Sequence, residues 1–163
     1  MKQNLNVCGA VGLFLSTTIN KLDKKGRVSV PSHFRTALSS ETFQGVVLFQ
    51  SYTQQAIEGV GMSAMETLSQ RVDSNFDFFS DNHDDMATIL FGESMQCGFD
   101  GDGRITLPQA FIDFMGIEDK VAFVGLGQKF QLWKPETFEA RKAEARKSLK
   151  NKKMTLPKGE RNE

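Results

Sequence analysis

A 17-residue segment occurs twice in this chain, 77 residues apart, and this internal repeat constrains the fold more than any other feature. Residues 22–38 read L-D-K-K-G-R-V-S-V-P-S-H-F-R-T-A-L, and residues 99–115 read F-D-G-D-G-R-I-T-L-P-Q-A-F-I-D-F-M. The offset pairs Asp23 with Asp100, Gly26 with Gly103, Arg27 with Arg104, Pro31 with Pro108 and Phe34 with Phe111. Two copies are too few for a solenoid, so the repeat predicts a fold built from two half-units, each unable to close a core alone.

Each copy predicts the same order of short elements. An extended stretch leads to a tight turn whose aspartate can accept backbone hydrogen bonds and whose glycine can adopt positive φ. In the short strand that follows, Val28 and Val30 are expected to face the core and Arg27 and Ser29 to face outward. Proline then begins a short helix. The expected elements of both units are extended segments 16–22 and 95–99, helices 32–38 and 109–115, and strands 45–50, 55–58, 120–125 and 130–133.

The intervening and final segments are predicted to be helical. Apolar residues recur at helical spacing over 62–72, a second helix over 81–91 should stop at Gly92, and a third should run from Pro135 to about Leu149, with a frayed tail from Lys150. We therefore expect an α+β fold. Its expected parts are an N-terminal extension (1–15), unit 1 (16–61), a helical connector (62–93), unit 2 (94–137) and a C-terminal helix with basic tail (138–163).

The composition is that of an ordinary soluble globular protein, with 39% apolar and 25% charged residues. Val7 to Leu15 is apolar, but no A-x-A cleavage site follows it, so we expect no signal peptide and a cytoplasmic protein with no membrane contact. The two cysteines, Cys8 and Cys97, are far apart and form no C-x-x-C pair, which favours reduced thiols over a zinc or disulfide framework. The segment from Asp100 starts like a calcium loop, but Phe111 stands where that loop needs glutamate.

The net charge is zero, yet the charges are strongly segregated. Residues 1–36 carry six basic residues and one acidic, and residues 139–163 carry nine basic and four acidic. Residues 37–138 carry five basic and fifteen acidic. Clustered positive charge favours a polyanionic partner, although the C-terminal block is equally compatible with a solvated helix face and tail.

The first repeated turn is the candidate contact with double-stranded DNA, because it presents five basic residues and one aspartate between positions 21 and 35. Arginine can bind phosphate or guanine with two donors, and lysine at a turn tip suits phosphate. The expected DNA-binding residues are Lys21, Lys24, Lys25, Arg27, Ser29 and Arg35. The residues expected to shape the turns are Asp23, Gly26, Asp100, Gly103 and Arg104. Asp102 and Asp113 make the second copy acidic, so we expect Arg104 to stabilise its turn only.

No set of residues indicates catalysis, a metal site, a cofactor or a small-molecule substrate. His33 and His83 lie in unrelated contexts, and neither cysteine has a basic partner nearby in the sequence, so no nucleophile, base and orienting group come together. Gly125 and Gly127 lack the strand–helix context of a dinucleotide site. We expect a non-enzyme.

These motifs resemble the MraZ family, a branch of the AbrB-like DNA-binding proteins, over roughly residues 14–145. The resemblance is carried by N-K-L-D-K-K-G-R-V-S-V-P-x-x-F-R, F-G-E-S, D-G-D-G-R and F-V-G-L-G-Q-K-F-Q-L-W-K-P-E. It implies two intertwined swapped-hairpin units with a barrel-like core. It also implies a homo-oligomeric ring that binds repeated promoter elements of the division and cell-wall gene cluster, as a repressor on the bacterial nucleoid. Asp102 departs from the basic pattern of the first turn. The alternative is an oligomeric scaffold protein whose basic patch is incidental, which would show no salt-dependent, sequence-selective DNA binding.

Overall fold

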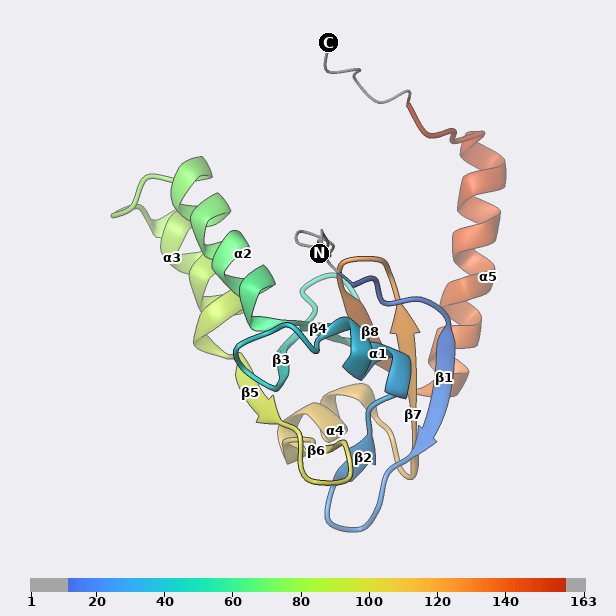
Figure 1. Cartoon of the computed structure of the whole chain (residues 1–163). Coiled ribbons are helices and arrows are strands. Elements are labelled where there is room, and N and C mark those ends of the chain that lie inside the picture. Colours follow the sequence, from blue (N-terminus) through green and yellow to red (C-terminus); the bar gives the residue numbers. More distant parts are fainter. Residues whose placement is uncertain (1–11, 158–163) are drawn as a thin grey trace, which may run out of the picture.

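The computed structural model describes residues 12–157, and its centre is a six-stranded antiparallel sheet with the strand order β1-β7-β8-β4-β3-β5 (Figure 1). The remaining two strands, β2 and β6, form a separate pair. The strands are β1 (Thr17–Lys21), β2 (Arg27–Ser29), β3 (Gly45–Gln50), β4 (Ile57–Val60), β5 (Met95–Gly98), β6 (Arg104–Thr106), β7 (Lys120–Gly125) and β8 (Phe130–Trp133). The helices are α1 (Ser32–Ala37), α2 (Met62–Asn75), α3 (Asp81–Ala87), the π-helix η1 (Thr88–Gly92), α4 (Gln109–Met115) and α5 (Pro135–Lys152).

Strands of the two repeats pair with each other rather than only within their own repeat. β1 pairs with β7, and the equivalent strand β5 pairs with β3. The pairing of β2 with β6 is centred on Val28 opposite Ile105, so a pseudo-twofold axis relates the two copies. Two matching hydrogen bonds extend this pair, from Val30 N to Gly103 O at 3.1 Å and from Leu107 N to Gly26 O at 2.8 Å. Each half therefore contributes strands to the sheets of the other.

The fold combines an antiparallel sheet with helices, as expected, but the large sheet is open rather than closed into a barrel. β1 and β5 are its two edges, and the part of the chain that the structure describes contains no closed barrel. The expectation of a barrel-like core is wrong in this respect. The physical reason is that β2 and β6 pair with each other beside the sheet and do not join its edges.

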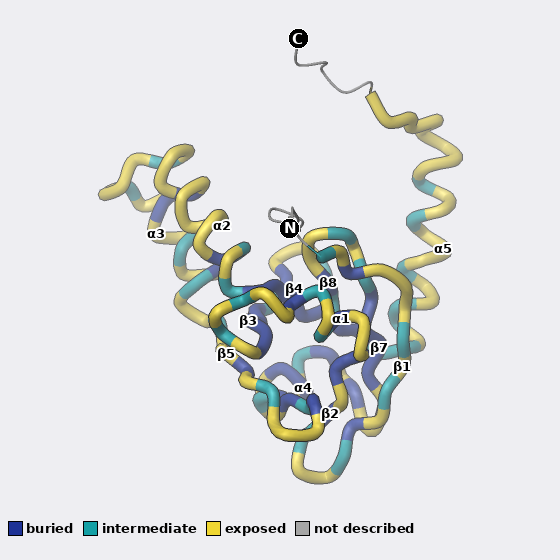
Figure 2. The backbone as a smooth tube through the Cα atoms, viewed as in Figure 1, coloured by how far each residue is buried: buried dark blue, intermediate teal, exposed yellow. Residues whose placement is uncertain are grey.

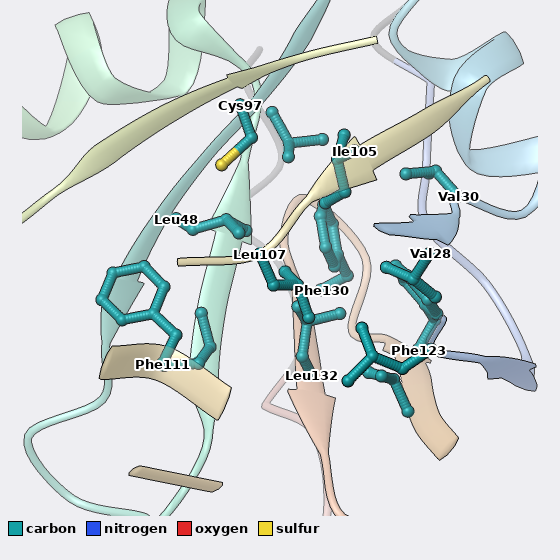
Figure 3. Packing of buried hydrophobic residues seen from close by; sticks show 14 of the residues in the cluster. Val28, Val30, Leu48, Cys97, Ile105, Leu107, Phe111, Phe123, Phe130 and Leu132 are labelled. Carbon is teal, nitrogen blue, oxygen red and sulfur yellow. The ribbon is translucent and has the colours of Figure 1, made fainter. Parts of the chain in front are cut away.

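The main core lies between one face of the large sheet and the layer of β2, β6, α1 and α4 (Figure 3). Val28 and Ile105, each 1% exposed, project from the small pair towards Phe123 and Phe130 of the large sheet. Phe34 of α1 is fully buried in the same core, with its ring 5.2 Å from that of Phe130. This confirms the expected inward face of the short strands.

Helices cover both ends of the opposite sheet face. At the β3 end, Met65 and Val72 of α2 and Leu90 of η1 pack with Val47 and Phe49. At the β7–β8 end, Phe138 of α5 packs on Trp133, with ring centroids 6.0 Å apart. The two helical arms project from opposite ends of the sheet and leave its middle between them (Figure 1).

Several element boundaries agree with the prediction because proline and glycine mark them. α4 spans Gln109–Met115 and ends at Gly116, whose φ of 70° is left-handed. β4 begins two residues later than expected. α5 continues to Lys152, three residues beyond the expected end, and Lys153 follows it in a left-handed conformation. None of the residues of α5 is buried, and it is exposed over most of its length (Figure 2).

Candidate nucleic-acid interface

The first repeated turn is organised by the carboxylate of Asp23. Its Oδ1 accepts hydrogen bonds from the backbone N–H groups of Lys25 at 2.9 Å and Arg27 at 2.8 Å, and its Oδ2 accepts a side-chain hydrogen bond from Arg27 Nε at 2.7 Å. Gly26 closes the turn with a φ of 81°. The backbone hydrogen bond from Arg27 is the main cause that lowers the pKa of Asp23 below its ordinary value. The turn is therefore rigid and carries an ionised aspartate at neutral pH.

The second turn repeats this geometry around Asp100. Asp102 N and Arg104 N donate to Oδ1 at 2.8 and 2.9 Å, and Arg104 Nε donates to Oδ2 at 2.9 Å. Gly103 has a φ of 74°. The backbone hydrogen bond from Arg104 likewise lowers the pKa of Asp100. One contact differs, because Arg104 Nη2 also lies 3.2 Å from Asp102 Oδ2.

The solvent face of the β2–β6 pair combines residues from both turns. Arg27 lies opposite Thr106, and Ser29 lies opposite Arg104. Residues paired across two strands point to the same side, and the intervening Val28 and Ile105 are buried, so these four side chains share the outward face. We did not expect Arg104 beside Ser29 from the sequence. The repeat in the sequence indicates the pseudosymmetry. Only the antiparallel pairing of β2 with β6 shows that Arg104 lies next to Ser29.

Lys24 and Lys25 are exposed and form the tip of the first turn, and this turn is the loop between β1 and β2 at the bottom of Figure 1. Neither lysine takes part in the ion pairs found within residues 12–157. Asp113 and Glu118 line the hollow beside the tip, so the surface next to the lysines is partly acidic. The tip itself is exposed (Figure 2).

The remaining two basic candidates lie away from this tip. Lys21 is the last residue of β1 and lies opposite Lys120 of β7. Arg35 of α1 packs over the other turn, because a Cβ built on Gly103 would lie 2.7 Å from Arg35 Cζ. Arg35 Nε also donates to Val30 O at 3.2 Å. The structure thus brings Lys24, Lys25 and Arg27 together, with Ser29 two residues along the strand. Lys21 lies at the base of the same hairpin, next to the bridge between Leu22 and Val28, whereas Arg35 packs over the second turn.

Other chemically active side chains do not assemble a second centre in the described residues. No group of three or more His, Cys, Asp or Glu side chains there is arranged to hold a metal ion. Burial raises the pKa of Cys97 to about 11, which keeps this thiol protonated and unreactive. Cys8 and the N-terminal run 7–11 lie outside the described residues. The helices between residues 12 and 157 include none with the length and apolar character needed to cross a bilayer.

Comparison with known proteins gives the same family as the motifs. A family model described as "MraZ protein, putative antitoxin-like" matches residues 90–158. A protein of Rickettsia bellii named Transcriptional regulator MraZ is 43% identical over 147 residues, which is 90% of this chain and 97% of the relative. Relatives of the same name from Rickettsia akari and Rickettsia rickettsii are 40% and 41% identical over 146 residues, with the same coverage.

The chain belongs to the MraZ family. The resemblance expected from the repeated motifs is thereby confirmed. The MraZ family model spans the second repeated turn, α4, β7, β8 and α5, so the match includes the acidic turn around Asp102 as well as the C-terminal helix. The coverage of nearly the whole length of the MraZ relatives means that both repeats belong to a shared architecture.

Proposed function

We propose that this chain is a DNA-binding transcriptional regulator that contacts DNA through the first repeated turn and the outward face of β2. The observation that carries the proposal is the rigid cationic tip of Lys24 and Lys25, followed by Arg27 on an exposed strand face. The names of the MraZ relatives support the regulatory role. The tip lysines suit phosphate, and the terminal guanidinium nitrogens of Arg27 suit phosphate or a guanine edge.

The geometry of Arg27 supports its proposed contact with phosphate or a guanine edge. Its Nε is held by Asp23, while no described carboxylate other than Asp23 forms an ion pair with it. The side chain is 33% exposed, so its free nitrogens face solvent. Because Asp23 already holds Nε, the guanidinium group loses little conformational freedom when its two terminal nitrogens bind a ligand. This favours specific contacts.

We further propose that the regulator binds as a homo-oligomeric ring on repeated promoter elements. Two arms of opposite charge at opposite ends of the sheet support head-to-tail assembly (Figure 1). Residues 73–85, at the end of α2 and the start of α3, hold five aspartates and neither lysine nor arginine. Residues 146–153, at the end of α5, hold five basic residues and no acidic one. A contact between different surfaces of successive copies closes into a ring when the rotation allows it.

A ring would multiply a weak contact. One basic turn per subunit gives a salt-sensitive interaction, and several turns on regularly spaced sites raise the effective concentration of each. Family membership suggests repression of the division and cell-wall gene cluster on the nucleoid, which we carry as part of the proposal. The AbrB-like swapped hairpin is likewise proposed, on the support of the β2–β6 pairing and the exchange of β1 and β5.

Selection of bound duplexes from random DNA, followed by binding titrations at several salt concentrations, tests the DNA proposal. We expect an enriched, repeated sequence and an affinity that falls steeply with salt. Failure to enrich any sequence with the full chain would refute specific binding and favour the scaffold alternative.

Light scattering tests the assembly separately. Asp81→Lys with Asp85→Lys should reduce the oligomer size, and Lys147→Glu with Lys150→Glu in the same chain should restore it. If the first pair leaves the size unchanged at moderate salt, the two arms do not form the interface.

A further inference from the structure

The middle of the large sheet carries a buried polar network on the face that the two helical arms leave open. Glu58 of β4 is only 7% exposed, and both of its carboxylate oxygens lie 3.1 Å from Gln131 Nε2 of β8. Lys129 Nζ lies 3.1 Å from Glu58 Oε1. Trp133 Nε1 donates to Gln131 Oε1 at 2.8 Å and so fixes the orientation of the amide. The Glu58 carboxylate is buried, whereas the Lys129 side chain is 48% exposed. Burying a carboxylate costs free energy even when it is paired, so this network calls for a role other than packing.

This network faces away from the candidate DNA contact. Glu58 lies opposite Gln131, which in turn lies opposite Val124 of β7, and Val124 lies opposite Thr17 of β1. Paired residues point to the same side of a sheet, so the four side chains form one row on this face. The next residue along β8, Leu132, points to the opposite face, into the core beneath β2 and β6 (Figure 3).

The row forms the floor of a hollow of about 550 Å³ whose wall is the first half of α5. That volume lies within the range of small-molecule sites. Arg141 and Lys142 of α5 line it, as do the hydroxyl-bearing Thr17 and Thr53. Lys142 Nζ lies 3.2 Å from Glu139 Oε2, whereas Arg141 is half-buried and takes no part in the hydrogen bonds and ion pairs found within residues 12–157. Lys129 already compensates Glu58, so the hollow retains an excess of positive charge.

We propose that this hollow binds a small molecule through a phosphate or carboxylate group, with Arg141 as the principal ligand of the oxyanion. A guanidinium with unused donors in a half-enclosed cationic hollow matches such a group, and the threonine hydroxyls offer neutral contacts for the rest of the ligand. Because the hollow and the β2–β6 pair lie on opposite faces of the sheet, a ligand there leaves the DNA-contacting turn free. This inference goes beyond the proposed DNA binding and stands without it.

The single tryptophan of the chain reports on the hollow directly, since Trp133 is hydrogen-bonded to its floor. We would titrate the full chain with inorganic phosphate and, separately, citrate at constant pH and ionic strength, and follow the indole N–H resonance and the fluorescence of Trp133. We expect a saturable change with at least one anion; the anion that saturates identifies the oxyanion. Loss of charge-assisted hydrogen bonds in Arg141→Ala should weaken binding by about tenfold or more.

Arg71→Ala is the control, because it removes an exposed arginine outside the hollow and outside the two charged segments proposed for assembly. Lys24→Ala controls for anions that bind the turn. Both variants should titrate like the wild type. A change that fails to saturate with both anions would overturn the proposal, as would unaltered binding by Arg141→Ala or an equal loss in Arg71→Ala.

Discussion

Lys25 and Asp102 occupy equivalent positions in the two repeated turns, where each donates its backbone N–H to the leading aspartate, at 2.9 and 2.8 Å. The backbones thus match while the side-chain charges are opposite. In the second turn the carboxylate pairs with Arg104, whereas in the first the lysine extends the positive tip beside Arg27. Together with Lys24, which stands where the second turn has the uncharged Gly101, this difference distinguishes the electrostatics of two otherwise similar hairpins.

Reversing the charge at either position should change the affinity for DNA without changing the backbone of the turn. Lys25→Asp should weaken DNA binding and reduce the magnitude of the salt slope by about 0.9 for each phosphate that the protein no longer neutralises. Asp102→Lys frees Arg104 of its second carboxylate and should strengthen binding. Fluorescence anisotropy titrations over a range of salt concentrations measure both. Equal affinity of Lys25→Asp and wild type would show that the tip does not touch DNA.

Truncating the two equivalent arginines gives an internally controlled comparison. Arg27→Ala and Arg104→Ala each remove one partly exposed i, i+4 ion pair of the same geometry, and Arg104→Ala also removes the contact with the exposed Asp102, so both melting temperatures should fall only slightly. Only Arg27→Ala should abolish specific DNA binding. Thermal unfolding and a gel-shift titration measure the two properties. Loss of DNA binding by a well-folded Arg104→Ala would instead assign both arginines to the interface, as their shared strand face allows.

The sequence predicted the local helices and strands better than it predicted which strands pair with each other. Pro31, Pro108 and Gly116 set the ends of α1 and α4 through backbone constraints that act within a few residues. The pairing of β1 with β7 joins residues about a hundred positions apart and has no local signal. Arg35 shows the same limit, because it is close to the first turn in sequence but packs over Gly103 in space.

The outcome for α5 has a different physical cause. The last turn of α5 buries no side chain, so the sequence there needs no apolar residues at helical spacing. The pattern that predicts amphipathic helices is therefore missing from this turn. Lys150 and Lys152 nevertheless lie near the negative end of the helix dipole and favour its continuation. Lysine is also a good helix former, and no glycine or proline interrupts the segment.

The tip of the α2–α3 arm should lose stability as the pH rises. His83 Nε2 lies 2.9 Å from Asp73 Oδ1 and its Nδ1 lies 3.4 Å from Asp84 Oδ1, so α3 is tied to α2 through the ring. The hydrogen bond with Asp73 is the main cause that raises the pKa of His83 above its ordinary value of 6.5. Stability from this protonated form is fully present below pH 6.5 and is lost as the pH rises through the folded-state pKa.

Hydrogen exchange of the α2 and α3 amides at about pH 6 and about pH 8, corrected for the intrinsic pH dependence, measures this effect. Protection should fall at the higher pH in the wild type and should not respond to pH in His83→Gln. A pH response of equal size in that variant would assign the effect to other groups of the arm.

The glycines of the turns provide a test of backbone conformation that does not involve charge. Gly26 has a φ of 81°, and a methyl group there would also lie 3.3 Å from Leu107 O. Gly26→Ala should therefore destabilise the protein by about 1–2 kcal/mol, the cost of a left-handed conformation for an L-residue.

Gly101→Ala is the matched control, because this turn glycine lacks a left-handed φ and a Cβ built on it meets nothing within 4 Å. Its stability should equal or slightly exceed that of the wild type, since alanine restricts the unfolded chain. Urea unfolding of the two variants measures the difference. A Gly26→Ala variant as stable as Gly101→Ala would mean that the first turn does not hold the conformation on which the geometry of Lys24, Lys25 and Arg27 depends.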